Sequence, residues 1–307
     1  MNTIELSLFS SRLTAVCDEM GAVLQRAAFS TNIKDRLDFS CAVFGPAGEL
    51  CAQAAHIPVH LGSMAFAMRD LVAGTAWSPG DVLIVNDPFL GGTHLPDITL
   101  VAPVYVADVL AGFVANRAHH ADIGAETPGS MPVSRSLEEE GILIPPTHLL
   151  RAGQPVAGVM HRIVSATASP AQMEGDLAAQ LSANRTGEQR LLELVQAMGQ
   201  QEFRAGLVAV NDYGARLAEQ ALSAIPNGCY HFRDVMDDDG MGEEVIPIAV
   251  TLQVSDAKVV VDFEGTAAQV DGNINCTMKD TSAGVFYVIR YMMPAHTPAC
   301  AGSFHKI

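Results

Sequence analysis

Two segments dense in glycine, proline, aspartate and histidine interrupt the first half of this chain, at residues 86–97 and 116–148. Short apolar runs at 82–85 and 98–101 flank the first segment, and each run has the length of a buried strand. Long loops attached to strand ends are common positions for binding and catalytic residues. The pattern therefore predicts a sheet whose connecting loops carry the chemistry.

Apolar spacing predicts the other elements. Steps of three and four predict helices, whereas short apolar runs beside Pro/Gly turns predict strands and hairpins. The expected elements are, in order, a helix over 13–27, a hairpin of 41–44 and 49–52, a short helix over 64–73, strands at 82–85, 98–101, 104–106 and 110–115, one or two long helices between 170 and 225, a hairpin of 246–254 and 259–263, and a helix over 283–293.

Strands, then a helical block, then strands again predict an α+β fold with mixed sheets, long loops that carry a metal site, and a helical block. We expect a metal-site domain with the helical block over 1–225 and a partial hairpin and helix domain over 226–307. The second domain is expected to be truncated at its C-terminus, because the apolar helix over 283–293 is followed by only 14 residues. Those residues are turn-like and cannot supply a packing layer, so an exposed apolar face is expected.

Composition restricts the classes of partner and the cellular compartment that we expect for this chain. The net charge is −16, from 34 acidic and 18 basic residues, which disfavours nucleic acid or an anionic membrane as a partner. Six cysteines are scattered without a CxxC pair, so reduced thiols are expected rather than a disulfide framework. The sequence has no basic leader and no apolar run of about 18 residues, and a cytoplasmic location is expected.

The richest group of potential metal ligands lies between residues 86 and 122. His94 and Asp97 flank Pro96 at the start of a predicted strand, and His119 follows another strand 25 residues after His94. Adjacent strands would bring these ends together. Imidazole and carboxylate groups without a thiolate suit Zn²⁺, Mn²⁺ or Fe²⁺, and three protein ligands would leave a position open for water. The alternative is a set of ordinary polar residues on surface loops.

Six stretches resemble, in chain order, signature stretches of the hydantoinase B/oxoprolinase family: NIKDRLDFSCAVF, HIPVHLGSM, NDPFLGGTHLPDITLVAPV, FVANRAHHADIGAETPGSMP, EEEGILIPP and EGDLAAQLSANRTGEQRL. The resemblance runs from about residue 12 to 304, and THLPD beside HHADIG is specific to this family. The family includes B subunits of N-methylhydantoinase, the corresponding half of 5-oxoprolinase and, more distantly, the large subunit of acetone carboxylases. The resemblance implies that His94, Asp97 and His119 hold the metal, with Asp38 of the DFS stretch as a further ligand.

The resemblance also implies a mechanism with two subunits. An A-type, actin-like ATPase subunit would phosphorylate the amide oxygen of a small cyclic amide, and metal-bound hydroxide would attack the activated amide. Neither GxGxxG nor GxxxxGK[ST] occurs in this chain, so ATP is expected on the partner of a hetero-oligomer. Asn86, Asp87 and His120 are candidates for proton transfer, and Asp122 is a further candidate catalytic residue. The alternatives are a ketone carboxylase of the acetone carboxylase type and an inactive remnant that serves as an assembly subunit.

Several neighbouring residues keep two interpretations. His120 and Asp122 could orient a ligand imidazole, or His120 could replace His119 as the ligand. His56 and His60 could line the substrate pocket or be buried and hydrogen-bonded. The run Glu138–Glu140 could include a general base or form a solvated face.

Overall fold

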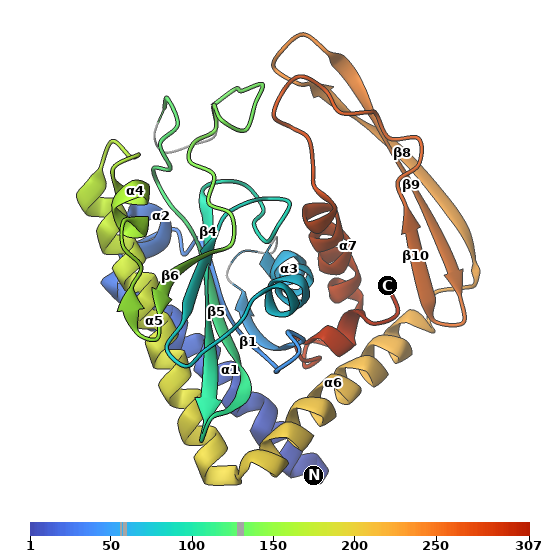
Figure 1. Ribbon diagram of the computed structural model, residues 1–307. Helices are drawn as coiled ribbons and strands as arrows, with labels where there is room; N and C mark the ends of the chain where they lie inside the picture. Colours follow the sequence, from blue (N-terminus) through green and yellow to red (C-terminus); the bar gives the residue numbers. More distant parts are fainter. Residues whose placement is uncertain (56, 58–59, 128–131) are drawn as a thin grey trace.

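A computed structural model describes residues 1–55, 57, 60–127 and 132–307 of the chain. A seven-stranded antiparallel sheet carries helices on both faces, and a smaller sheet of three strands stands beside it (Figure 1). This is the mixed α+β class that the sequence predicted. None of the described helices combines the length and apolarity that crossing a membrane requires.

The large sheet has the strand order β2-β1-β5-β4-β3-β6-β7. Its strands are β1 (Phe39–Phe44), β2 (Leu50–Ala55), β3 (Val82–Val85), β4 (Asp97–Val106), β5 (Val109–His119), β6 (Thr147–Arg151) and β7 (Gln154–Pro155). The sequence predicted two strands where β4 runs unbroken through Pro103. Strand β3 pairs with β4 only as far as Val101, so Pro103 needs no backbone donor on that side.

Helices cover both faces of this sheet. On one face lie α1 (Thr3–Ala27) and α5 (Pro170–Met198), and on the other lies α3 (His60–Gly74). Cys41 and Val43 of β1 pack toward α1 and α5, whereas Ala42 and Phe44 pack toward α3. Every residue of β1 is buried for this reason. Two short helices, α2 (Thr31–Lys34) and α4 (Val159–Val164), complete this part of the chain.

Helix α6 (Gln200–Leu222) leads to the small sheet, in which β9 (Glu244–Ser255) lies between β8 (Gly228–Asp238) and β10 (Lys258–Asp262). The predicted boundary at 225/226 falls between α6 and β8, and the division into two domains stays a prediction. The sequence did not predict β8. All its residues are exposed, so no buried face imposes the alternation of apolar and polar residues that marks a strand.

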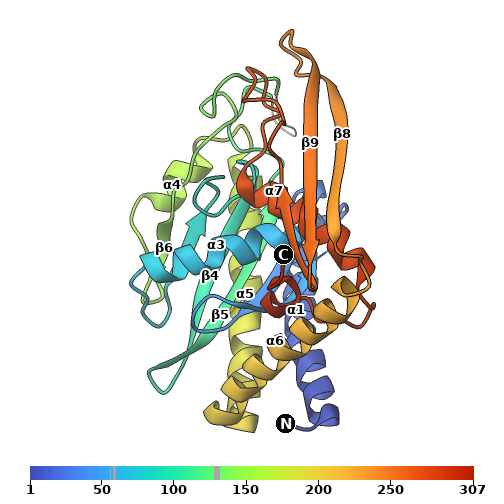
Figure 2. The same cartoon turned by 90° about the vertical axis from the view of Figure 1, so that its right-hand side faces the viewer.

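Helix α7 (Met278–Met292) lies between α3 and the small sheet, as Figures 1 and 2 show. The Phe286 ring stacks on Phe66 of α3 at 6.0 Å and on Phe304 of the short helix η1 (Ala301–Phe304) at 4.3 Å. Ile289 packs with residues of β9 and β10. The prediction that the residues after this helix supply no packing is wrong on this face, because Phe304 and Ile307 pack against it. The opposite face of α7 is apolar and exposed, and Tyr291 is 77% accessible.

Candidate metal centre

The hairpin of β4 and β5 brings two of the predicted ligands together. Asp97 at the start of β4 and His119 at the end of β5 are register partners. Val101 and Ala115 are also partners in this pairing, and both pack beneath α3. Side chains two or four residues apart on a strand share a face. Asp97 and His119 therefore lie on the face of the sheet that α3 covers.

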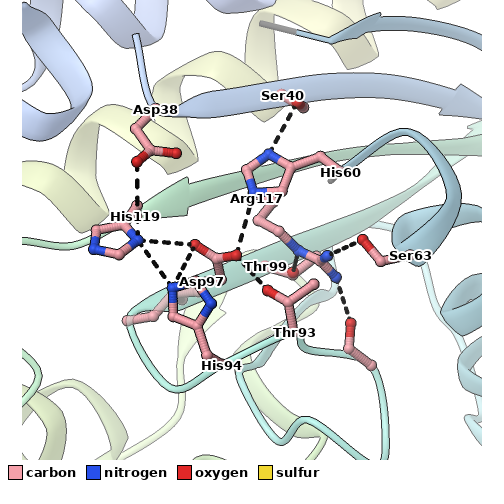
Figure 3. A network of polar contacts seen from close by, with 12 residues as sticks. Asp38, Ser40, His60, Ser63, Thr93, His94, Asp97, Thr99, Arg117 and His119 are labelled. Carbon is pink, nitrogen blue, oxygen red and sulfur yellow. Dashed lines mark hydrogen bonds and ion pairs between the residues drawn. The ribbon is translucent and has the colours of Figure 1, made fainter. Parts of the chain in front are cut away.

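The loop before β4 adds His94 to this pair. His94 Nε2 lies 3.0 Å from His119 Nδ1, and Asp97 Oδ1 lies 3.3 Å from His119 Nδ1 and 3.6 Å from His94 Nε2 (Figure 3). The Asp97 side chain is 1% exposed, whereas His94 is 30% exposed, so the group is open on the histidine side. We call the three candidate ligands His94, Asp97 and His119 together the metal centre.

The donor set fits a divalent transition metal. Zinc binds imidazole nitrogen and carboxylate oxygen at roughly 2.0–2.2 Å. The three separations of 3.0, 3.3 and 3.6 Å are less than twice that length, so one ion can contact all three atoms. Asp97 Oδ1 is buried, and its polar neighbours are the ring nitrogens of His119 and His94, as expected of three ligand atoms around one ion.

The second oxygen of Asp97 is held by other side chains. His60 Nε2 lies 3.2 Å from Asp97 Oδ2, and Thr93 Oγ1 donates to the same oxygen. His60 Nδ1 in turn contacts Ser40 Oγ at 3.0 Å. His60 is thus buried and hydrogen-bonded, which was one of the two interpretations that the sequence allowed. Its partner is the carboxylate of the metal centre. No spacing in the sequence indicates this contact, because it depends on how α3 docks. His56 lies outside the described residues.

Charges and burial oppose one another in the metal centre. Burial alone would raise the pKa of Asp97, but the charges of His94 and His60 and hydrogen bonds from His119 and His60 hold this pKa well below its usual value. Burial would lower the pKa of His119, but the hydrogen bond to Asp97 and the carboxylate charges raise it. Burial lowers the pKa of His94. An ionised carboxylate beside two imidazoles is suited to a cation.

Asp38 lies at the margin of the metal centre. It precedes β1, and its Oδ2 is 3.9 Å from His119 Nδ1. The backbone N–H of His119 also donates to the Asp38 carbonyl at 2.9 Å, which fixes the two residues side by side. Asp38 does not belong to the close group of His94, Asp97 and His119. Its role as a fourth ligand stays a prediction.

Arg117 connects three elements beside the metal centre, and the sequence did not single it out. This arginine is fully buried. Its Nε donates to Thr99 Oγ1 at 2.8 Å, its Nη1 donates to Ser63 Oγ at 2.7 Å, and its Nη2 donates to the Gly91 carbonyl. The guanidinium therefore ties β4 and α3 to the loop that carries His94. Figure 3 shows Arg117 beside Thr99 and Ser63. In the sequence, only its position two residues before His119 could have indicated this place.

His120 points to the other face of the sheet. Its Nε2 lies 2.9 Å from Gln180 Oε1 on α5. Gln180 Nε2 donates to the Ile98 carbonyl and to Asn116 Oδ1, so Oε1 is the acceptor and the proton belongs on His120 Nε2. Adjacent residues at a strand end face opposite sides, which separates His120 from His119. The geometry favours His119 as the ligand, and a catalytic role of His120 stays a prediction.

Asn86 and Asp87 make hydrogen bonds with backbone groups. Asn86 Nδ2 donates to the carbonyls of Leu95 and Ile142, at 2.8 and 2.9 Å. Asp87 Oδ1 accepts from the Phe89 N–H at 2.9 Å. These bonds hold the loop that leads to His94. Proton transfer by either residue stays a prediction.

Asp122 and the glutamate run make hydrogen bonds outside the metal centre. Asp122 Oδ2 accepts from the backbone N–H groups of Ala168 and Ser169 just before α5, at 2.7 and 3.2 Å. Glu139 and Glu140 accept hydrogen bonds from residues of their own loop. The structure does not bring these side chains into the group formed by His94, Asp97 and His119. The catalytic role of Asp122 stays a prediction.

Fold and site together define an α+β protein with a candidate metal centre on the face of its large sheet that α3 covers. The model of the hydantoinase B/oxoprolinase family matches residues 2–307, and the chain belongs to this family. A curated relative, the 5-oxoprolinase of Dictyostelium discoideum, is 35% identical over 324 residues, covering 100% of this chain and 25% of that protein. The chain spans between about a quarter and about half of the length of the first curated relatives it matches.

Two solved structures share the fold. The ATP-dependent caprolactamase from Pseudomonas jessenii superposes with a TM-score of 0.93 at 27% identity, covering 100% of this chain and 53% of that chain. The nucleotide-free structure of an acetone carboxylase superposes with a TM-score of 0.88 at 18% identity, covering 99% of this chain and 43% of that chain. At that identity the second likeness shows the fold alone.

Proposed function

We propose that this chain is the metal-dependent, B-type component of an ATP-dependent hydrolase of cyclic amides. Its partner in this proposal is an A-type, actin-like ATPase subunit. The observation that carries the proposal is the convergence of His94, Asp97 and His119 in a chain of the hydantoinase B/oxoprolinase family. The names of a similar 5-oxoprolinase and of a similar ATP-dependent caprolactamase support a lactam ring as the substrate class.

The described residues explain how the chain would prepare such a site. His60 and Thr93 hold one oxygen of Asp97, so the other oxygen is oriented before any ligand arrives. Arg117 holds the Gly91 carbonyl and thereby fixes the loop that carries His94. A bound divalent ion would supply Lewis-acid chemistry at the amide carbonyl or at water. ATP use belongs to the partner in this scheme, because the sequence carries neither phosphate-loop motif.

The test measures metal content and ring opening separately. The chain is purified alone and with an A-type subunit, and 5-oxoproline, hydantoin and ε-caprolactam are followed by mass spectrometry with and without ATP. We expect bound metal in the chain alone, and ring opening only with both the partner and ATP. His94→Ala and His119→Ala should lose the metal, whereas His305→Ala, at an exposed position, should retain it. Metal-free wild type, or ATP hydrolysis by the chain alone, would contradict the proposal.

A further reaction mixture addresses the competing activities. Acetone, bicarbonate and ATP replace the lactam, and the product is analysed for a new carboxyl group. Carboxylation without lactam opening would replace the hydrolase proposal with a ketone carboxylase. A metal-loaded chain that supports neither reaction with its partner would favour an assembly role.

A further inference from the structure

The first turn of α7 brings a second carboxyl group to the face of the metal centre. Helices α3 and α7 approach closely at Gly62, where an added Cβ would lie 2.8 Å from Ala283 Cα. In α3, Gly62 lies between His60, which contacts Asp97, and Ser63, which accepts a hydrogen bond from Arg117. Asp280 precedes Ala283 by three residues, and residues three apart share a face of a helix. Asp280 therefore faces the space beside the metal centre.

One oxygen of Asp280 is left without a donor. Asp280 Oδ2 accepts from Thr277 Oγ1 at 2.7 Å, in the cap of α7. Asp280 Oδ1 is buried and accepts no hydrogen bond from the described residues. Buried acceptors without a partner are uncommon in native proteins, and a ligand that supplies the donor is one explanation for them.

The surroundings of Asp280 link it to the metal centre. Burial raises its pKa, the Thr277 hydrogen bond and the charges of Arg117 and His94 oppose that rise, and the charge of Asp97 adds to it. The neighbouring Lys279 donates through Nζ to the Phe89 carbonyl at 2.9 Å, which anchors the start of α7 on the loop before His94. The carboxylate lacks the solvation that a further donor would provide.

We propose that Asp280 Oδ1 binds the N–H of a cyclic-amide substrate; this inference rests on the proposed function. The N–H and the carbonyl of a lactam belong to adjacent atoms, so the group that binds the N–H must lie beside the group that acts on the carbonyl. Asp280 meets this condition. Asp97 does not, because His60 and Thr93 occupy one of its oxygens and the other faces the two histidines. Asp280 then selects amides with a free N–H over N-alkylated ones.

Calorimetric titration of the metal-loaded chain tests this selection. The probes are 5-oxoproline and ε-caprolactam, each compared with its N-methyl counterpart, and hydantoin, compared with 1,3-dimethylhydantoin because hydantoin has two N–H groups. We expect wild type to bind the N–H form about 10- to 100-fold more tightly, the range of one hydrogen bond to a charged group. Asp280→Ala should lose this preference, and Asp280→Asn, which keeps a neutral acceptor, should retain part of it. Asp271→Asn, at an exposed position in the loop before α7, should behave as wild type.

The outcomes separate this inference from the proposed function. If wild type binds the lactams without an N–H preference, or if Asp280→Ala retains that preference, the role of Asp280 is overturned. The proposed function is not affected by either result. Elemental analysis accompanies each titration, and loss of the metal in Asp280→Ala overturns it too, because Asp280 would then support the metal rather than the substrate. Failure of wild type to bind any of the three lactams removes the proposed function and this inference with it.

Discussion

Asp97 and His119 face one another as register partners across β4 and β5, with Asp97 Oδ1 3.3 Å from His119 Nδ1. The metal centre is therefore built into the pairing of two strands. A shift of this register by one residue would turn one of the two side chains to the opposite face. Because both faces of the sheet are covered, the core on each face stabilises the register that assembles the centre.

His60 is expected to set metal affinity without binding the metal. It contacts Asp97 Oδ2, whereas the His94 and His119 nitrogens lie nearer Asp97 Oδ1. Residues that orient a ligand in this way typically change metal affinity by roughly 10- to 100-fold. His60→Ala should weaken binding by that factor in a chelator competition assay, whereas His161→Ala, at an exposed position on α4, should not change it. Equal affinity of His60→Ala and wild type would remove this role.

The contact between α3 and α7 should tolerate no side chain at position 62. A Cβ on Gly62 would lie 2.7 Å from Phe286 Cδ2 and 2.8 Å from Ala283 Cα. Gly62→Ala should lower the free energy of unfolding by about 1–3 kcal/mol, the usual cost of overpacking. Gly74→Ala, in the same helix with no atom within 4 Å of its added Cβ, is the matched control and should leave stability unchanged or slightly higher. Denaturant unfolding measures both, and equal effects would contradict the close approach.

Arg117 is expected to stabilise the fold and the metal centre together. Arg117→Met removes the donors to Thr99 Oγ1 and to the Gly91 carbonyl. Losing buried hydrogen bonds of a charged group should cost about 2–4 kcal/mol of unfolding free energy. Metal content should also fall, because the loop before His94 is released. The surface variant Arg190→Met should change neither quantity appreciably, since Arg190 pairs with the exposed Glu19 and Glu193. A stable, fully metal-loaded Arg117→Met would disprove this account.

The six cysteines should divide into two classes. Cys229 and Cys276 are exposed, whereas the other four are buried: Cys17, Cys41, Cys51 and Cys300. A thiol reagent at neutral pH should label the two exposed cysteines rapidly and the remaining four only after denaturation. Mass spectrometry of the labelled peptides identifies the sites. Rapid labelling of Cys17 in the native chain would show that the core around it opens easily.

Alkaline pH should destabilise the chain through its buried thiols. Burial raises the pKa of Cys17 from 9.0 to about 12. Between these values an unfolded chain releases the proton that the folded chain retains, so the unfolding free energy should decrease as pH rises. At neutral pH both states hold the proton, and the effect is absent. Cys17→Ala should lose this part of the decrease when unfolding is measured at pH 8 and pH 11. An unchanged pH dependence in Cys17→Ala would exclude the thiol as its cause.

The sequence by itself determined most of the elements and three of the residues that meet in the metal centre. Apolar periodicity identified α1, the β1–β2 hairpin, α3, β3 and the α5–α6 block, because each of these elements buries a regular stripe or run of side chains. The spacing of His94, Asp97 and His119 at strand ends indicated a shared site. Apolar periodicity did not predict strand β8, because this strand buries neither of its faces.

Only the tertiary structure decided which neighbours complete the centre. His60 and Asp280 reach it through the docking of α3 on the sheet and of α7 on α3, and the same docking gives Arg117 of β5 its partner Ser63. The choice between His119 and His120 also required the three-dimensional structure. The two histidines are adjacent in the sequence, but His119 faces α3 and His120 faces α5 in the fold. Local patterns record which residues are buried within one element. They do not record which elements pack together, because that depends on contacts between residues far apart in the chain.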